Sequence, residues 1–229
     1  MVTRTKTEEE CTSGDLDQMG VKAAHELKNS LTGVKALVQL GLRNPAETAS
    51  HERLIVVERE VKRMQEILSS YLSSARPLAE VRPARVDLGP LVSAVLRVLS
   101  GRADEAGVRL FSQGDATVQA DRRRLEEALL NLVANGIEAT PPGGEVVVEV
   151  RPFSDEIELV VRDTGRGMPP EALRRLGTPF FTTRAEGTGL GVVLARSVIA
   201  LHGGTLRYES EPGKGTTVRA TLPIRARAA

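Results

Sequence analysis

The stretch that decides the fold runs from residue 121 to residue 168 and reads DRRRLEEALLNLVANGIEATPPGGEVVVEVRPFSDEIELVVRDTGRGM. Asp121 is a good capping residue, so we expect a helix that opens there and continues to about Thr140. The segments GGEVVVEVR and EIELVVRD that follow have the valine-rich character of strands. A helix followed by two adjacent strands predicts a sheet with helices packed on it.

The segments on either side extend this domain. LGPLVSAVLRVLSGRADEAG (88–107) is expected to be helical and VRLFS (108–112) to be a strand. Residues 188–202 are expected to form a helix that ends at Gly203-Gly204, and TLRYES with GTTVRATLPI to form a final hairpin. The result is a mixed α+β domain, which we place at residues 85–225.

A different pattern precedes it. From Asp17 onward, apolar residues recur at helical spacing until GLRNPAETAS (41–50) breaks the helix, and a second helix follows with a 3.5-residue repeat. The first apolar set is Leu27, Leu31, Val34 and Val38; the second is Leu54, Val57, Val61, Met64, Leu68 and Tyr71. A hairpin this short cannot bury both apolar faces alone, so we expect a homodimer that forms a four-helix bundle.

The remaining boundaries follow from these elements. Residues 1–16 are polar and without period, which predicts a disordered leader before a hairpin at 17–76. Two prolines, Pro77 and Pro83, cannot continue a helix and mark a linker at 77–84. The start of the sequence lacks the apolar segment of a signal peptide, and no apolar run is long enough for a membrane span, so we expect a cytoplasmic chain.

Composition excludes several classes of site. The net charge of +1 gives no pull toward nucleic acid or an anionic membrane. The single cysteine, Cys11, excludes an internal disulfide and a cysteine metal cluster. Neither property names a partner.

The first helix carries AAHELKNSLTGV (23–34), in which His25 lies about 200° around the helix from Leu27 and so faces away from the apolar stripe. Glu26 follows it, and Asn29 shares its face one turn on. A solvated polar face is the plainer interpretation. The zinc-protease pattern H-E-x-x-H is excluded because its fifth position is Asn29. His51 and His202 have no ligand spacing to each other, and we expect surface and capping roles for them.

The α+β domain at 85–225 holds three further patterns, of which two concern polar side chains. NLVANGIEA (131–139) puts the amides of Asn131 and Asn135 one turn apart, where their oxygens suit Mg²⁺. Asp163 ends a strand before Thr164-Gly165-Arg166-Gly167-Met168 and can accept a hydrogen bond from an aminopurine. Asp-Thr-Gly also occurs in aspartic proteases, but there a small hydroxyl residue usually follows, whereas here Arg166 does, and no second copy exists.

The glycine-rich stretch TPFFTTRAEGTGLGVV (178–193) comes just before a predicted helix. Backbone amides at a helix N-terminus can cradle phosphates, so we expect a mobile lid over a phosphate site. The stretch has neither the spacing of a Walker A loop nor that of a dinucleotide fold.

These segments together resemble the sequence boxes of the histidine kinase core, in the right order over residues 18 to 222. HELKN resembles the H box, NLVANGIEA the N box, DTGRGM the first glycine box, PFFTTR the F box and GTGLG the second glycine box. Gly213-Lys214-Gly215-Thr216-Thr217 resembles the final G-x-G-T element. The form of the H box is most similar to nitrogen-regulator-type sensor kinases.

The resemblance implies a dimeric phosphoacceptor hairpin followed by an α/β sandwich ATP-binding domain of the gyrase, chaperone and histidine kinase type. It implies autophosphorylation of His25 from Mg-ATP, with Glu26 holding the proton of the other ring nitrogen, and transfer to an aspartate of a response-regulator receiver domain. Asn29 matches the position that orients a water for dephosphorylation, so a phosphatase activity is left open.

The resemblance also assigns the nucleotide site. Asn135, helped by Asn131, binds Mg²⁺, Asp163 selects adenine, and Arg184 faces the terminal phosphate. The remaining positions that it places around ATP are Gly165, Gly167, Phe181, Gly187, Thr188, Gly189, Leu190, Gly191 and Thr216.

Two departures from the family and two alternatives stay open. Ser30 stands where the family usually has proline, which removes a kink beside His25. No sensor segment is present, so the sequence is either a truncated core or a kinase that receives its signal through a partner. The alternatives are a hydrolytic ATPase of the same superfamily, which needs a glutamate where Asn131 stands, and a pseudokinase scaffold.

Overall fold

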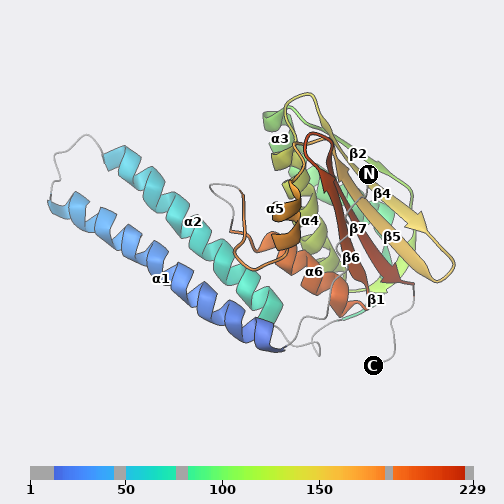
Figure 1. Ribbon diagram of the computed structural model, residues 1–229, viewed down its shortest axis with the longest axis horizontal. Coiled ribbons are helices and arrows are strands. Elements are labelled where there is room, and N and C mark those ends of the chain that lie inside the picture. Colours follow the sequence, from blue (N-terminus) through green and yellow to red (C-terminus); the bar gives the residue numbers. More distant parts are fainter. Residues whose placement is uncertain (1–12, 44–49, 76–81, 184–187, 225–229) are drawn as a thin grey trace.

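The computed structural model describes residues 13–43, 50–75, 82–183 and 188–224 (Figure 1). The first of its two parts is a hairpin of long helices, α1 (Ser13–Arg43) and α2 (Ser50–Ala75), which lie side by side. Helix α1 begins at Ser13, so residues 13–16 are helical and not part of a disordered leader. Ser13, Gly14 and Asp15 are not apolar and so add nothing to the periodic pattern, which is why the expected start was Asp17.

Both helices of the hairpin expose apolar side chains at heptad spacing. On α1 these are Leu31 and Val38, which are 59% and 48% exposed; on α2 they are Leu54, Val61 and Leu68, which are 64%, 39% and 47% exposed. The α1–α2 contact therefore covers only part of the apolar surface of the hairpin. The uncovered part is the seam on which the expectation of a four-helix bundle depends.

The second part is built on a five-stranded sheet of order β2-β4-β5-β7-β6. β2 runs parallel to β4, and the other neighbours are antiparallel. The strands are β2 (Arg109–Gln113), β4 (Glu145–Pro152), β5 (Glu156–Asp163), β6 (Thr205–Glu211) and β7 (Gly215–Pro223). A separate two-stranded sheet pairs β1 (Ala84–Asp87) with β3 (Thr117–Ala120).

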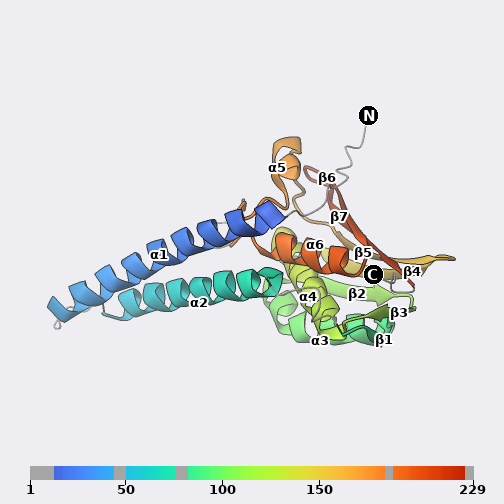
Figure 2. The same ribbon diagram turned by 90° about the horizontal axis from the view of Figure 1, so that it is seen from below.

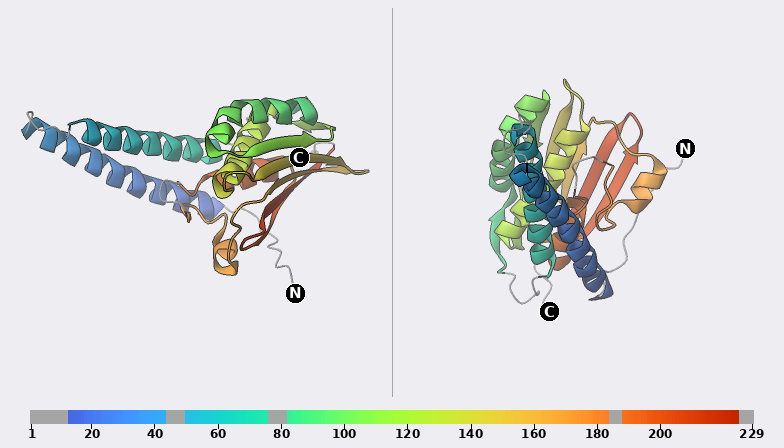
Figure 3. Two further views of the ribbon diagram at one scale, coloured as in Figure 1. Left: turned by 90° about the horizontal axis from the view of Figure 1, so that it is seen from above. Right: turned by 90° about the vertical axis from the view of Figure 1, so that its left-hand side faces the viewer.

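The helices of this part are α3 (Leu88–Ala106), α4 (Arg122–Ala139), α5 (Pro170–Arg175) and α6 (Gly191–Leu201). α3, α4 and α6 cover one face of the large sheet (Figures 2 and 3). The core lies between them and the inward side chains of the strands, which alternate along β4 and β5 with outward ones. This helix-on-sheet architecture confirms the predicted α+β class.

The opposite face of the sheet carries a network of ion pairs. Arg151 pairs with Glu149 and Glu158, and Arg219 pairs with Glu158 and Glu209. Glu149 is 8% exposed, and although burial favours its neutral form, the hydrogen bonds and charge of Arg151 hold its pKa below the usual range. The two faces of the sheet are therefore chemically different.

The structure tests several predicted boundaries of helices and strands. The Asp121 cap is confirmed, because its Oδ1 accepts from the backbone N–H of Arg124 at 3.2 Å. α6 begins at Gly191 and not at residue 188. The short elements β1, β3 and α5 were not predicted, and Ala84, placed in the linker, begins β1.

In the described residues no helix combines the length and hydropathy needed to cross a membrane.

Candidate active site

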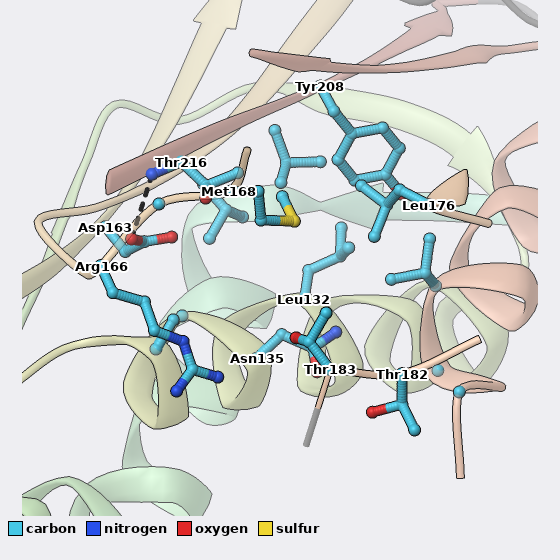
Figure 4. Close-up of a pocket in the computed structure, with 18 of the residues that line it drawn as sticks. Leu132, Asn135, Asp163, Arg166, Met168, Leu176, Thr182, Thr183, Tyr208 and Thr216 are labelled. Carbon is cyan, nitrogen blue, oxygen red and sulfur yellow. Dashed lines mark hydrogen bonds between the residues drawn. The ribbon is translucent and has the colours of Figure 1, made fainter. Parts of the chain in front are cut away.

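A cleft opens between α4, the ends of β5 and β7, and residues from the segments 166–183 and 189–192 (Figure 4). It contains about 930 Å³ of empty space, counted to its open mouth and therefore including solvent. Of the predicted nucleotide residues, the cleft is lined by Asn135, Asp163, Gly167, Phe181, Gly189, Gly191 and Thr216. Residues that come from four predicted boxes and the final G-x-G-T element therefore meet in one place.

Asp163 is the buried acid of this cleft, with only 7% of its surface exposed. Its Oδ1 accepts from the backbone N–H groups of Gly165 at 2.9 Å and Thr216 at 3.1 Å. Burial raises the pKa of Asp163, and these two hydrogen bonds offset part of that rise. Both donors go to Oδ1, so Oδ2 is left to accept from a ligand.

Two glycines beside Asp163 are required by close packing. A Cβ on Gly165 would lie 2.5 Å from the carbonyl oxygen of Ala139. Gly167 has a φ of 63°, and a Cβ there would lie 1.9 Å from the carbonyl oxygen of Glu211. Side chains at either position would push the loop off α4 and off the β6–β7 turn, so the glycines set the shape of the cleft wall.

Ser210 supports this wall, and sequence reasoning missed it. Its Oγ accepts from the backbone N–H of Met168 at 2.9 Å and lies 3.0 Å from Oγ1 of Thr216. A serine in a strand has no distinctive sequence pattern. Met168 itself lines the cleft together with apolar residues that the motifs did not mark, among them Leu132, Val161, Leu176, Tyr208 and Val218.

The two asparagines of α4 differ in position. Asn135 lines the cleft, whereas Asn131 does not. The Nδ2 of Asn131 donates to the carbonyl oxygen of Glu127 at 2.9 Å, and a Cβ built on Gly191 would lie 2.7 Å from its Oδ1. Asn131 therefore packs under the N-terminus of α6, with its carbonyl oxygen turned toward the glycine that opens that helix.

The described residues of the predicted lid lie in two different environments: some line the cleft, and others pack against the helical hairpin. Phe181 lines the cleft and is held by Arg175, whose guanidinium carbon lies 4.1 Å from the ring centre. Leu190 does not line the cleft; it is 1% exposed and packs with Ile67 of α2, with Leu27 of α1 and with Phe180. Thr188 is described but does not line the cleft, and Arg184 and Gly187 lie outside the described residues.

This apolar cluster joins the two parts of the molecule close to the predicted phosphoacceptor. His25 and Glu26 lie on α1, one or two residues before Leu27; their side chains are outside the described set. Asn29 is exposed, whereas Ser30 is buried. Leu190, which directly precedes α6, thus packs beside the helical turn that carries His25.

Comparison with known proteins agrees with both parts. The family described as His Kinase A (phospho-acceptor) domain matches residues 18–80, and the family described as Histidine kinase-, DNA gyrase B-, and HSP90-like ATPase matches residues 120–226. Sensor histidine kinase ZraS of Klebsiella oxytoca is 35% identical over 91% of this chain and 46% of its own length. Sporulation kinase A of Bacillus subtilis is 30% identical over 90% of this chain and 34% of its own.

Solved structures extend the comparison. The catalytic domain of histidine kinase ThkA superposes on 63% of this chain and 97% of its own with a TM-score of 0.58 and 28% identity. ThkA in complex with the response regulator TrrA covers 94% of this chain and 64% of its own with a TM-score of 0.77; at 23% identity this likeness concerns the fold.

The fold and the cleft define a phosphoacceptor hairpin joined to an ATPase domain of the gyrase and HSP90 type. The chain belongs to the two-component histidine kinases, of which it is a catalytic core. It spans about half the length of the ZraS proteins that it matches.

Proposed function

We propose that this chain is an ATP-dependent protein-histidine kinase that transfers the γ-phosphoryl group of Mg-ATP to His25. One observation carries the proposal: a single cleft has a buried carboxylate, Asp163, at one end and the glycine-rich N-terminus of α6 at the other. An aminopurine can donate to Oδ2 of Asp163. The phosphates then reach the amides and positive dipole end of α6.

The side-chain amides of Asn135 and Asn131 on α4 would hold a magnesium ion, which would neutralise charge on the phosphates. Mg²⁺ prefers oxygen ligands and keeps several waters, so it needs few protein groups. Asn135 lines the cleft, and the carbonyl oxygen of Asn131 faces Gly191. We propose Asn135 as the direct ligand and Asn131 as its helper, with Arg184 and Gly187 completing the phosphate site from the lid.

The chemical step follows from what the residues can do. A ring nitrogen of His25 attacks the γ-phosphorus, the bond from phosphorus to the bridging oxygen breaks, and ADP leaves with that electron pair. Glu26 accepts a hydrogen bond from the other ring N–H and so favours the nucleophilic tautomer. Positioning and charge neutralisation supply most of the rate, which fits a lid anchored beside His25.

We further propose that the phosphoryl group passes to an aspartate of a receiver domain, with Asn29 exposed where it can serve a phosphatase reaction. The solved complex of ThkA with a response regulator supports this partner. Because ATP is the donor, we place the core in the cytoplasm. Its hairpin is proposed at residues 17–76, its linker at 77–84 and its ATP-binding domain at 85–225.

A hydrolytic ATPase is a weaker interpretation. Asn131 stands where such an enzyme needs a glutamate base; its side chain donates to its own helix and has no group that can take a proton from water. A scaffold function leaves the buried carboxylate of Asp163, with one oxygen unused, without a purpose.

Magnesium-dependent labelling tests the proposal. Incubation with γ-labelled ATP and Mg²⁺ is expected to label the chain, and an excess of EDTA to abolish the label, because the metal neutralises the phosphates in the transition state. Undiminished labelling in EDTA would contradict the magnesium site, and release of free phosphate without labelled protein would favour the ATPase.

The exposed heptad seam predicts a homodimer. In light scattering, wild type is expected at twice the chain mass of 24.6 kDa. Val61→Glu with Leu68→Glu should shift it toward the single-chain mass, since each buried charge at such a seam costs several kcal/mol, of order ~3. Val98→Glu, at an apolar site on α3 that is more exposed than Val61 or Leu68, is the control and should leave the dimer intact. A wild-type monomer at all concentrations would contradict the four-helix bundle.

A further inference from the structure

Arg166 is the one cationic residue among the described residues that line the cleft. Its backbone is fixed on both sides: its N–H donates to the carbonyl oxygen of Ala139 at 3.0 Å, and its own carbonyl oxygen accepts from the N–H of Gly213 at 2.8 Å. The residue is exposed, so its long side chain is free to move while its Cα is held at the mouth of the cleft.

The guanidinium of Arg166 forms no ion pair within the part of the chain that the structure describes. Asp163, three residues earlier, takes its hydrogen bonds from backbone N–H groups and not from Arg166. Among the described residues, none uses the charge of Arg166 to hold the cleft together, so that charge is available to a ligand.

The position of Arg166 in the cleft determines whether it can contact the base or the phosphates of a nucleotide. It lies with Asp163 at one end of the cleft, with Thr182 at the other, and its side chain extends over α4 and away from Asp163 (Figure 4). At this end the wall formed by α4 consists of Gly136 and Ala139, which have little side chain with which to cover a purine ring. The α6 N-terminus, where the phosphates are expected, is distant from this end along the cleft.

We propose that Arg166 is a base-binding residue whose guanidinium plane packs on the face of the bound purine that α4 leaves uncovered. This inference rests on the proposed function, because it assumes an adenine nucleotide in the cleft. A planar, weakly hydrated guanidinium stacks on aromatic rings, whereas the ammonium of lysine is a compact, strongly hydrated point charge. Stacking adds affinity for any flat base, and Asp163 then discriminates by the exocyclic amine.

Calorimetry with Mg-ATP, Mg-ADP and AMP tests this assignment on the full chain. Arg166→Met keeps a long side chain and removes the guanidinium, and is expected to weaken all three ligands by the same factor, about 3- to 20-fold. Arg166→Lys should lose nearly as much as Arg166→Met. Arg162→Met is the matched control: it removes the same charge from β5 four residues earlier but outside the cleft lining, and should change affinity by less than about 2-fold.

A loss in Arg166→Met that grows from AMP to ATP, together with near-wild-type affinity in Arg166→Lys, would overturn base stacking in favour of a phosphate contact. Unchanged affinities in Arg166→Met would overturn any contact. The proposed function is tested separately by the wild type. If wild type binds Mg-ATP and becomes labelled while Arg166→Met binds equally well, only this inference fails.

Discussion

Replacing Asp163 by asparagine is expected to weaken Mg-ATP binding by about 10- to 100-fold, because the hydrogen bond from an exocyclic amine to a carboxylate is charge-assisted. The side chain has the same shape, and its carbonyl oxygen can still accept from Gly165 and Thr216. The loss therefore comes from the ligand contact and not from the loop. Isothermal calorimetry with Mg-ATP measures it directly.

The same substitution should stabilise the empty protein. Burial raises the pKa of Asp163, so the ionised carboxylate opposes folding: the contribution of this group is most favourable below the carboxyl pKa of the unfolded chain and is lost as pH rises through its raised folded pKa. The asparagine variant escapes that loss. Its melting temperature without ligand should exceed that of wild type at neutral pH, and the difference should vanish as pH falls below about 4.

Glu149→Gln is the matched control, since Glu149 is a second buried acid on the same sheet but on the face away from the cleft. The folded pKa of Glu149 is lowered, so its stabilisation is present above the unfolded carboxyl pKa and is lost as pH falls through the folded value. The control should therefore unfold more easily at neutral pH, by about 1 kcal/mol, and bind Mg-ATP normally. Equal ATP affinity in wild type and Asp163→Asn would contradict the assignment of Asp163.

Replacing His25 by glutamine is expected to lower protein labelling from γ-labelled ATP by at least about 1,000-fold, because a carboxamide nitrogen is not a nucleophile. His25 lies on the turn of α1 next to Leu27, which packs in the same apolar cluster as Leu190 at the N-terminus of α6. His25 belongs to α1, whereas the residues that line the cleft lie between Leu132 and Val218, so Mg-ATP affinity should stay within about 2-fold of wild type.

His51→Gln provides the control for histidine loss elsewhere in the hairpin, since His51 lies at the start of α2. It should be labelled as wild type is. Undiminished labelling of His25→Gln would move the phosphoacceptor to another residue, whereas equal loss in both variants would indicate damage to the hairpin.

Much of the nucleotide end could be predicted because its chemistry lies in short, contiguous segments. Asp163 and Asn135 each lie inside a motif whose spacing fixes its position, and the structure brings them into one cleft. Gly167 is determined equally locally, since its positive φ favours glycine.

What the sequence could not predict depends on contacts between distant segments. Asn131 shares a helix face with Asn135, but the approach of Gly191 from α6 puts it under that helix and out of the cleft lining. Leu190, which the resemblance placed around ATP, packs with Ile67 of α2 and is not among the residues that line the cleft. Ser210 hydrogen-bonds to Met168, which is far from it in sequence, and to Thr216, which faces it across the β6–β7 hairpin. No local pattern reports such packing.

The apolar stripe of α1 shows the same limit. Leu31, expected to be part of the stripe, is exposed, while its neighbour Ser30, a polar residue, is buried. Periodicity finds that a helix is amphipathic but does not divide its face between partners, here α2, the lid and the proposed second hairpin.

The most direct measurement of the central claim is the chemical stability of the label that wild type acquires from γ-labelled ATP and Mg²⁺. A phosphoryl group on a ring nitrogen is expected to survive alkali and to be lost in acid, and to be absent from His25→Gln. A label that survives acid would place the phosphate on a hydroxyl side chain and would contradict the assignment of this chain as a histidine kinase.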